Sequence, residues 1–349
     1  MVALLRGAGL QQIDGDLLVD DALFAPTPSG GTIDGLVSEP YNVEPIATLM
    51  NFKSTKFVVS PGKKQAQIVL DPPLAGVPIE NRVKLVGGPC RYAANSLSID
   101  QRGDQARPTL RVSGRYSRAC RERWSYFAVL DHRQFIEAFF RGAWEAGGGS
   151  WKGHARMASG AAARLNRAPW QVWTSPRTLA EVIGDVNKFS NNVMTRMLLM
   201  QLASHAGAVP ATEALGRHQV EGWLKLNQLP FPGLVLDNGA GLSRQARLDA
   251  GGLTGLLVAM GKGPYADLLR ESLPVLGRDG TLRWRLADEP VAGRAWLKTG
   301  SLADVRSIAG YLDARSGERY ALTLIINGPI VRRATEVQDE LLRWLYENG

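Results

Sequence analysis

The sequence predicts a protein of the α/β class, of the α+β type, in which a strand-rich region precedes an antiparallel sheet covered by helices. Three observations support this prediction. Short β-branched or aromatic segments gather between residues 50 and 130, apolar residues recur at helical spacing between 133 and 260, and a hairpin followed by a helix closes the chain. With 349 residues, 45% hydrophobic and 21% charged, the composition excludes disordered, collagenous and coiled-coil proteins.

Residues 1–130 are predicted to be mainly strand and loop. A helix ends before Gly9, an apolar strand over 13–20 is entered through an Asp-Gly turn, and residues 24–41, rich in Pro, Gly, Ser and Thr, form a loop. Turns containing Pro-Gly, Gly-Gly and Arg-Gly-Asp separate the segments that follow. These segments predict a small β domain of six short strands, at 56–60, 66–70, 83–86, 95–99, 109–113 and 124–129.

Helical periodicity begins at Arg133. Aromatic residues recur every three or four positions until the glycine triplet at 147–149, and this stripe predicts core packing rather than cofactor binding. A second helix is predicted to begin at Ser175 and Pro176, because proline suits the first helical position. Residues 190–192 interrupt it, and further helices are predicted over 193–205 and around 220–224.

The last third of the chain predicts an antiparallel sheet with helices over it. Residues 234–237 are expected to form a strand that leads into a glycine-rich loop, and a helix is expected around 253–260. The remaining predicted elements are an edge strand at 296–301, a hairpin of 308–313 with 320–326, and a terminal amphipathic helix with apolar residues from Val337 to Leu345.

Hydropathy and charge limit the classes of partner. No stretch approaches the roughly 18 unbroken apolar residues of a membrane-spanning helix, so no transmembrane segment is predicted. The N-terminal apolar run is too short for a signal peptide, so any export signal is expected outside this chain. The net charge of +8 arises from scattered arginines without a contiguous basic stripe, so nucleic acid is not a predicted partner.

Metal, cofactor and histidine-based chemistry lack their usual motifs. Cys90 and Cys120 are too few for a zinc site, and neither lies near a histidine at ligand spacing, so no metal site is predicted. The sequence has no Walker loop, dinucleotide fingerprint, His-Glu-x-x-His helix or Gly-x-Ser-x-Gly turn, so no cofactor is predicted. For the cysteines, the residue pattern leaves two alternatives: a disulfide in an oxidising compartment, or two buried thiols in a cytosolic protein.

Two polar triplets carry the candidate chemistry: Ser190-Asn191-Asn192 between two helices, and Lys298-Thr299-Gly300 on a strand. Triplets of this kind occur in penicillin-binding proteins and β-lactamases. Each is weak alone, since the first could cap a helix and the second could be a surface strand. Their order, and the hairpin and terminal helix that follow, make the combination far more specific.

With these motifs the sequence resembles the D-alanyl-D-alanine carboxypeptidase/endopeptidase family, the class C low-molecular-mass penicillin-binding proteins, along nearly the whole chain. The segments that carry the resemblance are 9–24, 186–192, 237–244, where Ala240 replaces the usual Ser, 276–281 and 298–302. It implies a penicillin-binding/β-lactamase-like peptidase domain interrupted by a long β-rich insertion. The implied divisions are a remnant of the N-terminal part of the peptidase domain (1–20), the β-rich inserted region (21–165) and the C-terminal part of the peptidase domain (166–349).

The resemblance also implies roles for the site residues in a serine-type hydrolase. Ser190 would pass a proton between a neighbouring lysine and the leaving amine, and the Asn192 amide would bind the substrate peptide. The strand that contains the second triplet would offer a backbone N–H to an oxyanion hole. The terminal carboxylate of a peptidoglycan stem peptide ending in D-Ala-D-Ala, or that of an inhibiting β-lactam, would be bound by Lys298, Thr299, Gly300 and Ser301.

The family's nucleophile and general base come from a Ser-x-x-Lys motif, which the resemblance places before Met1. Only Ser60-Pro61-Gly62-Lys63 matches formally, and its glycine and β-rich flanks predict a turn rather than a helix. The chain is therefore expected to be an N-terminal truncation or a natural short form, inactive by itself. The alternative is a non-catalytic protein that binds cell-wall muropeptides.

The resemblance implies a periplasmic protein, although the export signal is not in this chain. The periplasm is an oxidising compartment in which disulfides persist. Both cysteines fall in the β-rich inserted region, so the resemblance implies a disulfide between Cys90 and Cys120.

Overall fold

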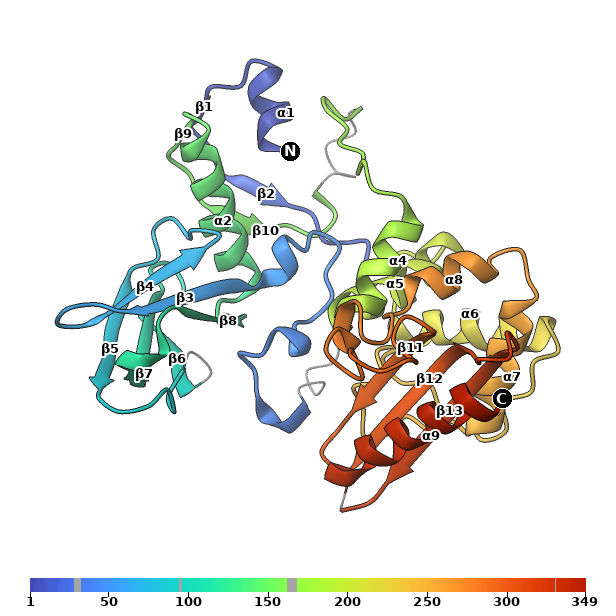
Figure 1. The fold of residues 1–349 in the computed structure, drawn as a ribbon. Coiled ribbons are helices and arrows are strands. Elements are labelled where there is room, and N and C mark those ends of the chain that lie inside the picture. The colour runs from blue at the N-terminus through green and yellow to red at the C-terminus, as the bar shows by residue number, and fades with distance from the viewer. Residues whose placement is uncertain (28–32, 94–95, 162–167, 330) are drawn as a thin grey trace. The chain divides into compact units, whose positions relative to one another are not determined.

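The computed structural model describes residues 1–27, 33–93, 96–161, 168–329 and 331–349. The chain divides into two compact units, Met1–Thr174 and Ser175–Gly349 (Figure 1). The first contains mostly short strands, and the second a three-stranded sheet with helices. This confirms the predicted α+β class.

Two three-stranded sheets form most of the first unit (Figure 1). In the first sheet, β3 (Thr55–Pro61) pairs antiparallel with both β4 (Ala66–Asp71) and β8 (Arg123–Phe127). In the second, β7 (Thr109–Ser117) pairs parallel with β5 (Ile79–Val86) and antiparallel with β6 (Leu97–Arg102). Side chains from both sheets share one apolar core, which confirms the small β domain; its members include Phe57, Val59, Leu110 and Val112.

A helix preceded by a capping box supports the rest of this unit. The Asp131 carboxylate accepts from the Gln134 backbone N–H at 2.7 Å, and the Gln134 side chain accepts in return, so α2 (His132–Ala146) begins there. The predicted aromatic stripe is core packing, since Phe135, Phe140 and Trp144 are buried. Around α2 lie the short elements α1 (Val2–Gly7), β1 (Gln12–Ile13), β2 (Leu17–Val19), β9 (Ser150–Trp151) and β10 (Ala155–Met157).

The strand predicted over 13–20 is two strands, β1 and β2, which pair in parallel with β9 and β10. The break falls at Gly15, whose carbonyl accepts from the Trp151 indole N–H at 3.0 Å. A side chain at Gly153 would lie 2.0 Å from the same carbonyl, so the two backbones approach too closely for any residue but glycine.

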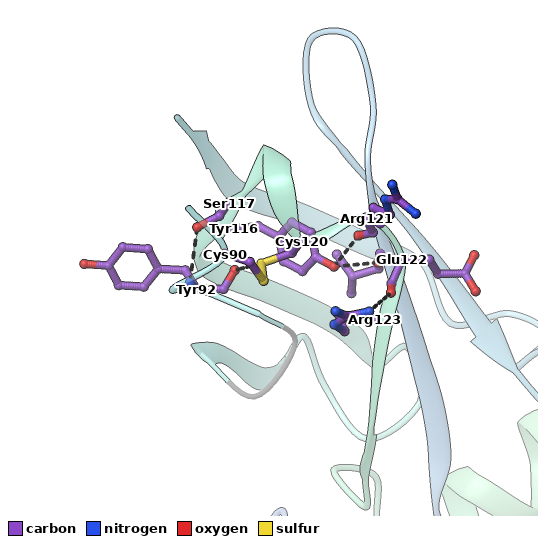
Figure 2. The surroundings of a disulfide bond; sticks show 9 residues. Cys90, Tyr92, Tyr116, Ser117, Cys120, Arg121, Glu122 and Arg123 are labelled. Atoms are coloured by element: carbon purple, nitrogen blue, oxygen red, sulfur yellow. Dashed lines mark hydrogen bonds between the residues drawn. A yellow bond between two sulfur atoms is a disulfide. The ribbon is translucent and has the colours of Figure 1, made fainter. Parts of the chain in front are cut away.

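A disulfide joins Cys90 and Cys120, with 2.08 Å between the sulfurs (Figure 2). The Ser117 backbone N–H donates to the Tyr92 carbonyl at 2.9 Å, so the loop that carries Cys90 is also held to the end of β7. The buried Tyr116 hydroxyl lies 2.9 Å from the Val59 carbonyl. This is the cysteine pairing that the family resemblance implies.

The second unit is built on the antiparallel sheet β11 (Ala295–Ser301), β12 (Val305–Asp313) and β13 (Arg319–Asn327). The terminal helix α9 (Ala334–Asn348), red in Figure 1, packs Leu342 against Ile308 and Leu312. Helix α7 (Ala250–Gly261) covers the other face, where the Tyr311 hydroxyl donates to the Leu257 carbonyl at 2.7 Å. The edge strand, the hairpin and the terminal helix are confirmed.

The described part of this unit has four further α-helices and two short 3-10 helices: α4 (Leu179–Phe189), α5 (Asn192–His205), α6 (Glu213–Leu226), α8 (Ala266–Ser272), η6 (Gly280–Leu282) and η7 (Val331–Arg333). The start predicted at Ser175 is wrong. A capping box between Thr178 and Glu181 begins α4 three residues later than Pro176, because the Glu181 carboxylate accepts from the Thr178 N–H at 2.6 Å. The seven-residue α8 was not predicted, because it is too short for a helical period to stand out.

The strand predicted over 234–237 is also wrong. Only one bridge forms there, between Val235 and Arg247. The chain turns at once, because the Asn238 side chain donates to the Leu242 carbonyl at 2.9 Å and accepts from the Ala240 N–H at 3.0 Å. No helix in the described part of the chain has the length and apolar character that crossing a bilayer requires.

Candidate active site

Ser190 stands at a sharp junction between two helices. It follows the last residue of α4 in the left-handed conformation, with φ 55° and ψ 49°, which is unfavourable for a residue with a side chain. Asn191 then caps α5, since its side chain accepts from the Met194 N–H at 3.1 Å, and its own N–H donates to the Val186 carbonyl at 3.0 Å. The junction therefore holds Ser190 in one defined backbone conformation.

Lys298 lies on β11, which pairs with β12 along its length and, on its other side, bridges to Val275 only at Trp296, before the site. Its Nζ donates to Ser190 Oγ at 2.9 Å and to the carbonyl of Thr299 at 3.0 Å. The two sequence motifs thus meet through a side-chain hydrogen bond across 108 residues of chain.

The Lys298 ammonium is half-buried, and the described part of the chain supplies no counter-ion for it. In the described residues no carboxylate pairs with it, and burial lowers the pKa of Lys298 below its usual value. Taking an ammonium out of water without an opposite charge is costly. A site of this kind favours an anionic ligand, which would supply the missing charge.

On the side of β11 away from β12, backbone N–H groups near Lys298 are available to a ligand. Leu297 N–H donates to the Pro274 carbonyl at 2.8 Å, on the side away from β12. Backbone direction alternates along a strand, so the N–H groups of Thr299 and Ser301 point to the same open edge. The edge beside Lys298 can therefore donate to an extended peptide or to a developing oxyanion.

The other predicted site residues lie nearby in the chain. Asn192 is the first residue of α5. Gly300 pairs with Ser307 of β12, and a side chain there would lie 2.5 Å from Ser307 Oγ. Thr299 and Ser301 alternate with Lys298 along the pleat, so their side chains leave the opposite face of the strand. Their role in binding remains a prediction.

The glycine-rich loop is linked to the β11–β12 turn by an ion pair between Arg244 and Asp304, with 2.6 Å between nitrogen and oxygen. Within the loop, Gly239 has a φ of 77° and Gly241 a φ of 71°, values that favour glycine. The loop therefore belongs to the same side of the second unit as the end of β11.

Ser60 does not have the setting of a helical Ser-x-x-Lys. It lies in β3, where it pairs with Gln67 of β4. Gly62 makes the turn that follows, and a side chain there would lie 2.4 Å from the Gln65 carbonyl. The Arg118 guanidinium donates to the Gly62 carbonyl at 3.1 Å. The formal motif is thus a strand end and a tight turn.

The family model described as the D-Ala-D-Ala carboxypeptidase 3 (S13) family matches residues 1–347. The chain belongs to this family. The D-alanyl-D-alanine carboxypeptidase of Actinomadura sp. (strain R39) is 32% identical over 168 residues, which are 47% of this chain and 31% of that protein. Carboxypeptidase DacB of Mycolicibacterium smegmatis is 35% identical over 175 residues, which are 47% of this chain and 37% of that protein. The matches therefore span about a third of each relative.

Solved structures of penicillin binding protein 4 share the fold. The crystal structure of penicillin binding protein 4 (dacB) from Haemophilus influenzae superposes with a TM-score of 0.74 and 22% identity. The match covers 99% of this chain and 78% of that protein. A structure of the same protein complexed with a novel β-lactam gives a TM-score of 0.69. The chain therefore has the penicillin-binding peptidase fold.

Sequence reasoning missed two residues beside the site. Lys188 Nζ donates to Asp279 Oδ2 at 2.6 Å, two residues before Ser190. Both residues lie in segments that carry the family resemblance, at 186–192 and 276–281, so their motif membership was the available signal.

Proposed function

We propose that this chain carries the substrate-binding and proton-relay part of a serine-type D-Ala-D-Ala carboxypeptidase/endopeptidase that acts on peptidoglycan peptides in the periplasm. One observation carries the proposal: the half-buried Lys298 ammonium, without a described counter-ion, touches the Ser190 hydroxyl at an open strand edge. A peptide with a free terminal carboxylate matches this arrangement in charge and shape.

The roles follow from the chemistry of each group. Lys298 binds the terminal carboxylate of the substrate, or that of a β-lactam. The Ser190 hydroxyl both accepts from Lys298 and can donate, so it can hand a proton to the leaving amine. The Asn192 amide binds the substrate backbone, and an N–H on the open edge of β11 stabilises the oxyanion. The backbone N–H groups of Thr299 and Ser301, with Gly300 between them, complete the carboxylate site on the open edge of β11.

The acylating serine is the remaining requirement. Acyl transfer needs a serine beside a base, and the only Ser-x-x-Lys in this sequence, at 60–63, lies in a strand and turn. We therefore expect the chain as printed to bind substrate without acylation. The division into 1–20, 21–165 and 166–349 as peptidase, insertion and peptidase stays part of this proposal.

Peptide binding tests the proposal directly. Isothermal titration of the chain with an N-acetylated peptide ending in D-Ala-D-Ala should show binding, and the C-terminal amide of the same peptide should bind about 10- to 100-fold more weakly, because a charge-assisted hydrogen bond is worth about 1.5 to 3 kcal/mol. Lys298→Met should reduce binding of the acid by the same factor. The matched control is Lys262→Met, a change at an exposed lysine of the same unit. Equal binding of acid and amide would overturn the proposal.

A non-catalytic muropeptide-binding protein is the second candidate, and the strand setting of Ser60 favours it. Both candidates require peptide binding, and they differ in acylation. A longer form with an upstream Ser-x-x-Lys segment should acylate only if the protein is an enzyme.

A further inference from the structure

One segment of the second unit lies against both motif-bearing elements. On one side, residues 274–276 run beside β11: the Leu276 N–H donates to the Ala295 carbonyl at 2.9 Å, and the Leu297 N–H donates to the Pro274 carbonyl at 2.8 Å. The second of these bonds is one residue from Lys298. The segment therefore fixes the edge of β11 just before the site.

The same segment holds the end of α4. Lys188 Nζ donates to Asp279 Oδ2 at 2.6 Å and to the Leu273 carbonyl at 3.1 Å. The other carboxylate oxygen of Asp279 accepts from the Val275 N–H at 2.7 Å. The Lys188 ammonium thus binds the last turn of α4 to residues on both sides of the 274–276 segment.

Two further contacts tighten this junction. The Asn187 amide donates to Ser272 Oγ at 2.8 Å. Gly280 has a φ of 53°, and a side chain there would lie 2.7 Å from the Lys188 carbonyl, so the loop after Asp279 touches the α4 backbone itself. Helix ends fray when nothing holds them. Here the end is held from several sides.

We propose that Lys188 and Asp279 form a positioning clamp, with Gly280 as its contact surface, that sets Ser190 within hydrogen-bonding reach of Lys298. This inference rests on the proposed function for its catalytic meaning. Among the described residues, no hydrogen bond joins Lys188 or Asp279 to Ser190 or Lys298, so both are positioning residues rather than catalytic ones. The role of the segment 276–281 would then be to position Ser190 relative to Lys298, through Asp279 and Gly280.

A purely stabilising ion pair is the competing explanation. The Lys188 and Asp279 side chains are 23% and 38% exposed, and ion pairs with this much contact with water contribute little to folding stability. If the pair only stabilised the fold, its loss would lower the unfolding temperature and leave the site unchanged. A positioning role predicts the reverse. Its loss should disturb the site strongly and the unfolding temperature weakly.

The test compares Asp279→Ala and the milder Asp279→Asn with a matched control. The control is Asp339→Asn, which breaks the 2.6 Å ion pair between Arg285 and Asp339 that ties another loop of this unit to α9. Lys188→Arg is the conservative variant, because it keeps the positive charge and its donors. The first readout is the NMR titration of lysines carrying ¹³C-dimethyl labels, with the Lys298 signal assigned by Lys298→Arg.

We expect Asp279→Ala to raise the titration midpoint of Lys298 toward that of exposed lysines, since a loosened junction admits water to Lys298. Binding of the D-Ala-D-Ala peptide should weaken about tenfold, because a charge-assisted contact contributes about that much. Asp279→Asn should act in the same direction more weakly. Lys188→Arg should keep both readouts close to those of the parent chain, because it can still pair with Asp279, and Asp339→Asn should leave both unchanged.

An unchanged Lys298 midpoint in a folded Asp279→Ala protein would overturn the clamp, as would an equal shift in Asp339→Asn. These outcomes stay separate from a failure of the proposed function. If the parent chain binds no peptide, the proposed function fails, while the Lys298 titration still decides whether Asp279 holds the site together.

Discussion

Breaking the Cys90–Cys120 disulfide should destabilise the first unit by about 3.5 kcal/mol. The perturbation is Cys90→Ser, chosen because Cys90 is exposed whereas Cys120 is fully buried and stays in place. The bond closes a loop across a sequence separation of 30 residues. The chain-entropy relation for a loop of that length gives about 12 cal/mol/K, which is about 3.5 kcal/mol at 25 °C.

Hydrogen exchange measures this loss within the unit concerned. Amides of β7 lie in the centre of the sheet next to the disulfide, and their exchange through opening of the unit should accelerate several hundredfold in Cys90→Ser. Amides of β12 serve as the control in the same molecule, since they belong to the second unit. Unchanged protection of β7, or an equal loss in β12, would refute the argument from loop closure.

Two further predictions concern the first unit. Burial lowers the pKa of His132 to about 4, so stability should be lost as pH falls from about 6.5 to 4, by at most about 3 kcal/mol, because the unfolded chain binds the proton first. In urea unfolding at a series of pH values, His132→Asn should remove the loss of unfolding free energy between pH 6.5 and about 4. His218→Gln, at an exposed position, is the control and should leave that loss unchanged. The same pH dependence in His132→Asn as in the parent chain would contradict the assignment. Tyr116→Phe should cost about 1 to 2 kcal/mol, because it leaves the buried Val59 carbonyl without that donor, and chemical denaturation would show no loss if the bond contributes nothing.

Periodicity located most elements but not their ends. The strands β3, β4, β7 and β8 and the helix α2 stand out because alternation or helical spacing runs through each of them. The start of α4 was misplaced because proline and a capping box compete within four residues, and the hydrogen bonds of Thr178 with Glu181 decide the outcome. At 234–237 the apolar run has no partner strand, so it remains a single bridge.

The site was predicted from motifs rather than from pattern. Ser190 and Lys298 were identified by their triplets, but the residue spacing around each of them does not predict the hydrogen bond that joins them across 108 residues. The Lys188–Asp279 pair was missed for the same reason, since it joins residues 91 apart and depends on how α4 packs. Tertiary contacts of this kind follow from the packed structure and not from short-range sequence order.

Covalent labelling by penicillin tests the central claim most directly. The chain as printed and a longer form, in which a Ser-x-x-Lys segment precedes residue 1, are incubated with a labelled penicillin and analysed by intact-protein mass spectrometry. We predict no adduct on the printed chain and an adduct on the longer form. Lys298→Ala should slow acylation of the longer form about 10- to 100-fold, because it removes a charge-assisted hydrogen bond. An adduct mapped to Ser60, or a longer form that binds the D-Ala-D-Ala peptide but is never labelled, would contradict it.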